Sequence, residues 1–290
     1  MEENLIIDFT PTGMIPVKAM TPHVPVTASE IIEDVHAAYE LGITKVHLHA
    51  RRPENEDPEY RKEIYAGIIS GIRKFATDLV ICVSLSGRTF NKFEERSDVL
   101  DLQGFLKPDM GSLTLSSLNF NKIASMNSPE MIQALAYRMK SLGIAPELEA
   151  FDAGMINYAK YLIKKELLES PYYFNILLGN IACAQADILY AGIMIRDLPD
   201  SSLWSMAGIG DDQLKMNSVA IAIGGGVRVG LEDNIWYNKS RTRLASNIDL
   251  LKRVHILADA NERAIMSPGE FRSRMNLQKG NGEYGRKRAS

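Results

Sequence analysis

The feature that most constrains the fold of this chain is a regular alternation between short apolar runs and longer segments of helical periodicity. The apolar runs predict β-strands at residues 5–10, 44–50, 79–84, 110–115, 145–151, 172–177, 202–207 and 227–231. Eight strand–helix units in about 260 residues predict a closed, parallel (β/α)8 barrel, the TIM-barrel architecture. An open, doubly wound sheet has the same periodicity and is the alternative that the pattern leaves.

Capping residues support the predicted helices between these strands. Thr27 and Glu30 have the spacing of a capping box, Gly42 ends the same helix, and Ser128 precedes Pro129 at the start of another. Later helices are expected at 60–75, 181–196, 211–223 and 240–260. Three more are expected with one bound each: one ends at 106, one begins at 129 and one ends at 168.

The division of the chain follows from this pattern. We expect a single catalytic barrel domain at residues 1–277. Residues 278–290 are rich in Gly, Lys, Arg and Ser, so we expect a flexible C-terminal tail there.

Composition restricts the class of protein rather than the reaction. Of the 290 residues, 46% are hydrophobic and 24% are charged, and the formal net charge of −3 argues against nucleic-acid or membrane-surface partners. No apolar run approaches the ~20 residues of a membrane-spanning helix, and the N-terminus lacks the basic start of a secretory signal. The two cysteines, Cys82 and Cys183, lie far apart in apolar contexts, as in a reduced, cytoplasmic protein.

Two histidines end the second predicted strand, at the barrel end where active sites lie. His47 and His49 share one face of the strand because side chains alternate, while Val46 and Leu48 face the helices. Two imidazoles directed into a barrel mouth are well placed to bind a metal. The alternative is a pair of core histidines that are satisfied by hydrogen bonds.

A catalytic metal needs a third protein ligand and an open coordination position. Glu232 ends the eighth predicted strand, which in a closed barrel is next to the first, and a His, His, Glu set suits zinc. A solvated turn is the alternative for Glu232 to Asn234. Arg228 shares the strand parity of Glu232 and needs an anionic neighbour if it is buried, which Asp233 or Asp152 could supply. An Arg–Asp pair beside a metal can hold an ionised base ready.

Other strand ends are polar in the same way. Ser84, Ser112, Thr114 and Glu149 lie at or near the ends of the third to fifth predicted strands. Around one metal they would form a substrate cradle, although polar residues that line a barrel are often structural hydrogen-bonding groups.

The sequence resembles the family of β-keto acid cleavage enzymes (BKACE), whose prototype is 3-keto-5-aminohexanoate cleavage enzyme. The resemblance runs from about Ile6 to Asn276. Its markers are Pro25-Val-Thr27, His47-Leu-His49-Ala-Arg51, Lys107-Pro-Asp-Met110, Ser117-Leu-Asn-Phe120, Pro146-Glu-Leu-Glu149, Gly154-Met155, Ala207-Gly-Ile-Gly210 and Arg228-Val-Gly-Leu-Glu-Asp-Asn234.

The resemblance implies a barrel that binds zinc through His47, His49 and Glu232 and uses Asp233 with Arg228 as its base. It implies that Ser84, Ser112 and Glu149 surround a bound keto acid. The reaction of the family converts a β-keto acid and acetyl-CoA, the co-substrate, into acetoacetate and a new acyl-CoA by a retro-Claisen step. A homo-oligomer, such as a tetramer, is also implied.

The chain departs from the prototype where the far end of the substrate would lie. The prototype has a glutamate that receives the ammonium of its substrate, and Ile15 is the counterpart here. Isoleucine cannot pair with an ammonium, so we expect a keto acid that is uncharged or apolar at its far end unless another loop supplies a partner. Arg88, in a loop that also departs from the prototype, could meet a second carboxylate or lie exposed.

Two other functions are compatible with parts of the pattern. A metal-dependent hydrolase of the amidohydrolase type also carries a His-x-His strand motif, but on its first strand and with further histidines on later strands. A non-catalytic metabolite-binding barrel would have the pocket without the chemistry, and it would have little use for a metal with an open position.

Overall fold

The computed structural model describes residues 4–286 and forms a closed barrel of eight parallel strands, as the alternation predicts. The strands are β1 (Ile7–Phe9), β2 (Lys45–Leu48), β5 (Val80–Val83), β6 (Met110–Thr114), β9 (Ala145–Ala150), β10 (Tyr172–Leu178), β11 (Ser202–Gly208) and β12 (Gly226–Val229). The barrel closes where β12 pairs with β1, with Asp8 in register with Arg228. An open, doubly wound sheet is therefore excluded.

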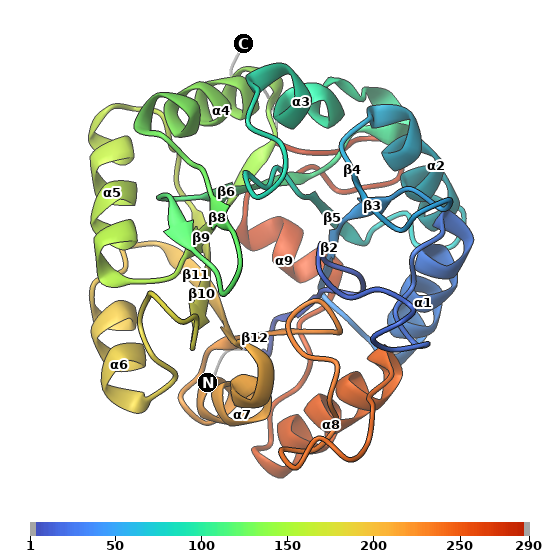
Figure 1. Cartoon of the computed structure of the whole chain (residues 1–290). Coiled ribbons are helices and arrows are strands. Elements are labelled where there is room, and N and C mark those ends of the chain that lie inside the picture. Colours follow the sequence, from blue (N-terminus) through green and yellow to red (C-terminus); the bar gives the residue numbers. More distant parts are fainter. Residues whose placement is uncertain (1–3, 287–290) are drawn as a thin grey trace.

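Helices surround this barrel in a ring (Figure 1). They are α1 (Ala28–Leu41), α2 (Lys62–Arg73), α3 (Phe93–Ser97), α4 (Pro129–Leu142), α5 (Ala153–Lys164), α6 (Ile188–Arg196), α7 (Gln213–Ala222) and α8 (Asn247–Ala260). The capping box of Thr27 and Glu30 is formed, and Ser128 accepts a hydrogen bond from the amide of Met131 at the start of α4.

Short elements fill the connections between the barrel units. Two small hairpins lie in the loops, β3 (Ala50–Arg51) with β4 (Pro58–Glu59), and β7 (Leu118–Asn119) with β8 (Ala124–Ser125). Three 3-10 turns complete the connections, at Asp98–Asp101, Gly104–Leu106 and Gly210–Asp212.

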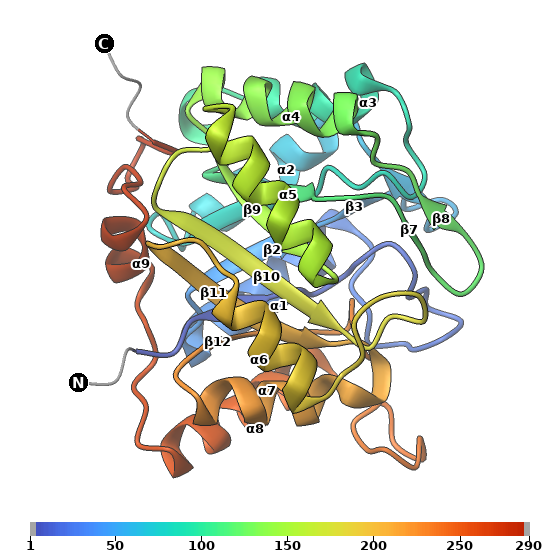
Figure 2. The ribbon, with the colours of Figure 1, turned by 90° about the vertical axis from the view of Figure 1, so that its left-hand side faces the viewer.

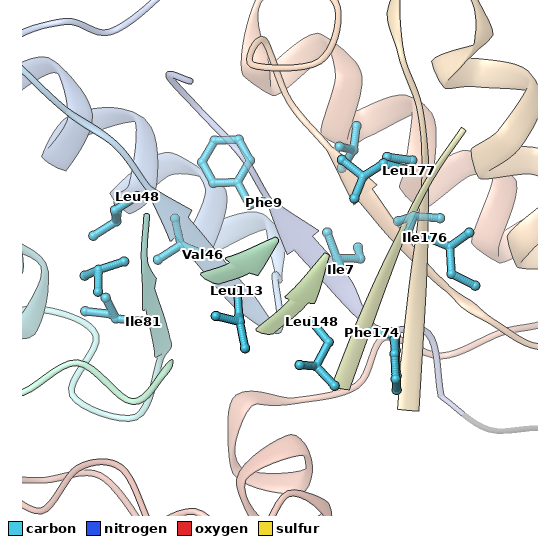
Figure 3. Packing of buried hydrophobic residues seen from close by; sticks show 14 of the residues in the cluster. Ile7, Phe9, Val46, Leu48, Ile81, Leu113, Leu148, Phe174, Ile176 and Leu177 are labelled. Atoms are coloured by element: carbon cyan, nitrogen blue, oxygen red, sulfur yellow. The ribbon is translucent and has the colours of Figure 1, made fainter. Parts of the chain in front are cut away.

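The apolar core lies between the strands and the helices. Alternate strand residues such as Ile7, Phe9, Val46 and Leu48 are fully buried and belong to one cluster with apolar residues of the helices (Figure 3). The intervening residues, such as Asp8, Lys45 and His47, are polar and equally buried. The strand alternation therefore assigns apolar side chains to the helix layer and polar side chains to the barrel interior.

A ninth helix covers one end of the barrel. In Figure 2 the arrow of β10 points toward the end that carries β7 and β8, and α9 (Pro268–Arg274) lies at the opposite end. Phe271 and Met275 form a second apolar cluster with residues near the strand starts, including Ile6 and Tyr173. This helix closes the N-terminal mouth of the barrel, which leaves the carboxyl end of the strands for chemistry.

Two predicted helix starts are wrong, and α9 was not predicted. Helix α6 begins at Ile188 rather than 181, because the side chain of Asp187 accepts hydrogen bonds from the amides of Leu189 and Tyr190. Helix α8 begins at Asn247 rather than 240, after a capping box of Ser246 and Asp249. Ser267 and Pro268 begin α9 with the same Ser-Pro signal that begins α4.

The predicted boundary at residue 277 stays a prediction. Within the segment after it, residues 278–286 contact the barrel: the amide of Gly285 donates to Asp109 (3.0 Å), and the amide of Arg286 donates to the carbonyl of Gly143 (2.7 Å). Residues 287–290 lie outside the described range. Among the residues described, no helix is long and apolar enough to cross a bilayer.

Candidate active site

Three side chains from distant parts of the chain converge at the carboxyl end of the barrel. His47 belongs to β2, His49 follows it directly, and Glu232 lies in the loop after β12. The Nε2 atoms of His47 and His49 are 3.1 Å apart, and His49 Nε2 is 3.2 Å from Glu232 Oε1. The three ligand atoms lie within 4.8 Å of one another, which is the spacing that one metal ion requires.

The orientation of His47 is fixed from below by a buried ionic chain. Its Nδ1 is 2.7 Å from Glu147 Oε1, and Glu147 also pairs with Lys45, which lies 2.7 Å from Asp8. Burial lowers the pKa of His47, but the carboxylates of Glu147 and Glu232 outweigh it and raise this pKa to about 8. A histidine that donates its Nδ1 proton to a carboxylate presents Nε2 as a ligand.

Arg228 connects the carboxylates above it. Its Nη2 lies 2.6 Å from Glu232 Oε1, and its Nε lies 3.0 Å from Asp233 Oδ2. Of the two anionic neighbours considered from the sequence, Asp233 is the one it binds, whereas Asp152 caps α5. Burial raises the pKa of Asp233 to about 6, although Arg228 opposes this. Asp233 is therefore an oriented carboxyl group that can both accept and release a proton near neutral pH.

The donor set fits a divalent cation. Burial raises the pKa of Glu232, but Arg228 and His49 outweigh it and hold this pKa well below its usual range, so the carboxylate is ionised. Its Oε2 is buried without a hydrogen-bond partner in the described range, residues 4–286. An anionic oxygen that is buried and unpaired beside two imidazole nitrogens is the environment that a zinc-type ion would complete.

Gly13 allows the chain to pass directly over Glu232. Its φ is +66°, and a Cβ placed there would lie 2.6 Å from Glu232 Cγ. A side chain at this position would strain the backbone and displace the carboxylate.

We therefore expect Gly13→Ala to weaken metal binding about 10-fold or more, the scale at which residues that orient ligands act. Titration of the purified variants with Zn²⁺ measures this. Gly67→Ala is the matched control, because a Cβ on this residue of α2 would meet nothing within 4 Å. An unchanged affinity in Gly13→Ala would contradict the role given to this close approach.

The predicted cradle residues lie around the histidines, but they are engaged to different degrees. Ser84 lines a pocket beside His49, whereas the Oγ of Ser112 accepts a hydrogen bond from the amide of Leu85 (3.0 Å). Thr114 donates to Glu149 Oε2 (2.6 Å), and burial raises the pKa of Glu149. Ser84 is thus open to a ligand, while Ser112 and Thr114 also hold neighbouring groups.

The loop after β1 borders the same pocket. Met14 lines it together with the aromatic residues Tyr60 and Phe90, and the carboxylates of Glu59 and Glu95 also line the pocket. The side chain of Ile15 is 50% exposed. The residue that meets a substrate in this loop could therefore be Met14 as well as Ile15.

Sequence reasoning missed the lower part of the polar interior. Asp8 binds Lys45 and accepts a hydrogen bond from Asn175 (2.8 Å), and Tyr173 donates to Ser205 (2.8 Å). The signal that could have found them is the alternation of side chains along each strand, because each of these residues lies on the face of its strand opposite the apolar core. Their partners come from different strands, so the pattern of one strand could not identify them.

Comparison with known proteins identifies the family of this chain. The family model of the beta-keto acid cleavage enzymes (BKACE) matches residues 4–277. The chain is 35% identical over 281 residues to the 3-oxoadipate:acetyl-CoA acetyltransferase of Cupriavidus necator, covering 96% of each chain. It is 33% identical over 281 residues to the 3-keto-5-aminohexanoate cleavage enzyme of Fusobacterium nucleatum subsp. nucleatum, covering 96% of this chain and 100% of the relative.

A solved structure supports the same fold. The ternary complex of ObcA with C4-CoA adduct and oxalate superposes with a TM-score of 0.78 at 20% identity, over 90% of this chain and 68% of that one. At this sequence identity, the structural similarity supports the barrel fold alone. The family model and the two relatives are specific to the sequence, and they show that this chain belongs to the beta-keto acid cleavage enzyme family.

Proposed function

We propose that this chain cleaves a small β-keto acid with acetyl-CoA, giving acetoacetate and a new acyl-CoA, and that zinc bound by His47, His49 and Glu232 is required. The observation that carries the proposal is the convergence of these three ligands beside the Arg228–Asp233 pair. Membership of the family supports the reaction class.

The reaction balances without a further reagent. A proton leaves C2 of the keto acid, and the C2 carbanion forms a carbon–carbon bond with the thioester carbonyl of acetyl-CoA. The CoA thiolate is expelled and forms the new thioester at C3, and the bond between C2 and C3 breaks. C2 then regains a proton, so the product acetoacetate contains C1 and C2 of the substrate and the acetyl group of acetyl-CoA.

The residues of the chain would divide this work. Asp233, held by Arg228 at 3.0 Å, would accept the proton from C2 and later return it. Arg228 would keep this carboxyl group oriented and would offset the charge of Glu232. Ser84, Ser112, Thr114 and Glu149 would surround the keto acid. When bound, zinc would polarise the keto oxygen and so make the C2 proton more acidic.

The far end of the keto acid is not set by the family. The two relatives are named for a dicarboxylic keto acid and for an amino keto acid. The loop after β1 offers no carboxylate to an ammonium, because neither Met14 nor Ile15 can pair with one. Of the two carboxylates that line the pocket, Glu59 is already paired with Arg61, and Glu95 belongs to α3. We therefore expect turnover of amino-substituted keto acids to be poor.

A coupled assay tests the proposal. Purified protein is incubated with acetyl-CoA and a panel of neutral, acidic and amino-substituted β-keto acids, and acetoacetate is read by mass spectrometry with and without a chelator. We expect acetoacetate that depends on both acetyl-CoA and metal, with activity restored by added Zn²⁺. Absence of acetoacetate across the panel, with metal confirmed bound, would refute the reaction. Strong turnover of the amino substrate would refute the expected preference alone.

A further inference from the structure

The loop after β5 is held firmly at the barrel mouth. The guanidinium of Arg96 donates to the carbonyl of Leu85 (2.8 Å) and to Oδ1 of Asn127 (2.8 Å). The carbonyl of Gly87 accepts from the amide of Met126 (3.0 Å), and a Cβ on Gly87 would lie 2.3 Å from the carbonyl oxygen of Met126. The next residue, Arg88, therefore extends from a fixed point of the backbone.

The side chain of Arg88 stacks on an aromatic ring and has no anionic partner among the residues that the structure describes. Its guanidinium lies over the ring of Phe120 at 3.6 Å, and Phe120 packs edge-on against Phe151 at 5.9 Å. Its Nε is buried and has no hydrogen-bond partner among residues 4–286. A buried N–H donor without a partner costs free energy that a ligand acceptor would recover.

Three other arginines near this end of the barrel are occupied. Arg51 donates to the carbonyls of Glu56, Gly13 and Pro16. Arg96, in α3, donates its hydrogen bonds to the carbonyl of Leu85 and to Asn127. Arg228 is committed to Glu232 and Asp233. Of these four arginines, Arg88 is the one that remains available to a ligand.

Arg88 lies in the loop after β5, at the same end of the barrel as the catalytic side chains, with its guanidinium over Phe120. Burial lowers its pKa, and the carboxylates that oppose this are Glu232, Glu149 and Asp233. None of these carboxylates forms an ion pair with Arg88 within 4 Å in the described part of the chain. The guanidinium therefore interacts electrostatically with these carboxylates without being paired to one of them.

We propose that Arg88 binds a second carboxylate of the keto acid, so that the preferred substrates are 3-oxo dicarboxylic acids. This inference rests on the proposed function. The first carboxylate is attached to the carbon that reacts, which places it beside the metal ligands and Asp233. A second carboxylate, separated from the keto carbon by a short methylene chain, would extend from the metal ligands toward Arg88, and guanidinium binds such a group through paired N–H donors.

The inference replaces the expectation of an uncharged far end. The sequence also left open that Arg88 meets a second carboxylate, and its buried, unpaired Nε supports that alternative. The absence of a carboxylate at position 15 fits a dicarboxylic substrate as well as an uncharged one, because a carboxylate there would repel the second carboxylate of the substrate.

A matched pair of substrates tests the role of Arg88. 3-Oxoadipate and 3-oxohexanoate have the same chain length and differ in the second carboxylate. We expect the wild type to prefer 3-oxoadipate in kcat/KM about 10-fold or more. Arg88→Met should lose about 10- to 100-fold on 3-oxoadipate, the range for a hydrogen-bonded charged group, and change little on 3-oxohexanoate. Arg88→Lys should recover part of the loss, because lysine keeps the positive charge but lacks the paired N–H donors of the guanidinium.

Each other outcome would overturn the inference in a distinguishable way. An equal loss on both substrates, with a raised KM for the keto acid, would assign Arg88 to the first carboxylate. A raised KM for acetyl-CoA would assign it to a phosphate of CoA. A wild type that prefers 3-oxohexanoate, or an Arg88→Met variant that keeps its preference, would exclude the role. Failure of the wild type on every keto acid would instead refute the proposed function. Unchanged melting temperature and metal content would show that the variants are folded.

Discussion

Asp233→Asn is expected to lower kcat for acetoacetate formation about 10²- to 10⁴-fold, the usual contribution of a positioned general base. The amide keeps the shape of the carboxyl group and can still accept the hydrogen bond from Arg228 Nε (3.0 Å). It cannot take a proton from C2 of the substrate. The measurement is the steady-state rate with acetyl-CoA and the best keto acid of the panel.

Metal content separates this effect from loss of the metal site. Asp233→Asn should keep bound zinc, because His47, His49 and Glu232 are intact. Glu232→Gln should instead lose metal as well as activity, because it removes the anionic ligand. Asp197→Asn is the matched control, since Asp197 pairs with Arg196 on the exposed end of α6 and should leave the rate unchanged. A rate of Asp233→Asn within about 10-fold of wild type would contradict the base role.

Asp109→Asn is expected to destabilise the fold by about 3–5 kcal/mol, the scale for breaking a buried ion pair. Asp109 is fully buried at the start of β6 and binds two buried arginines, Arg73 at 3.0 Å and Arg272 at 2.8 Å. It also accepts hydrogen bonds from the amides of Ile81 and Gly285 (both 3.0 Å). Neutralising it would leave two buried cations without a counter-ion and loosen α9 from the barrel.

Thermal unfolding measures this effect. At about 2–4 °C per kcal/mol, the loss corresponds to a melting temperature lower by on the order of 10 °C. Asp101→Asn makes the same substitution at an ion pair on the surface, with Arg138, and should cost no more than about 1 kcal/mol. Equal decreases in melting temperature for the two substitutions would show that the buried Asp109 ion pairs stabilise the fold no more than the surface pair does.

The same cluster predicts a dependence of stability on pH. Burial raises the pKa of Asp109, but Arg272 and Arg73 outweigh it and lower this pKa below its usual value. A carboxyl group with a depressed folded-state pKa stabilises the fold above its unfolded pKa of about 3.9 and loses this contribution as pH falls through the folded value. Asp109→Asn should therefore lose less stability than the wild type on acidification below about pH 4. An identical acid profile in both proteins would contradict this linkage.

The barrel could be predicted from the sequence because its signal is local and repeated. Each strand carries its own apolar run, and each helix its own periodicity, so that one irregular unit did not hide the pattern. Helix starts at 188 and 247 were less visible. The segment before α6, residues 181–187, is rich in alanine and resembles a helix, and only the capping side chains mark the true first turns. Helix α9 carries the same Ser-Pro start as α4, but it lies outside the strand–helix repeat that guided the prediction.

The sequence by itself determined that His47 and His49 share one face of a strand, because side chains on a strand alternate. It also determined that Val46 and Leu48, which alternate with them, face the helix layer. Only the tertiary structure decided that Glu232, 183 positions from His49, lies 3.2 Å from it, and that Arg88 remains unpaired while its neighbours are occupied. Parity is a property of one strand, whereas such contacts depend on how barrel closure and loop packing bring distant strands together.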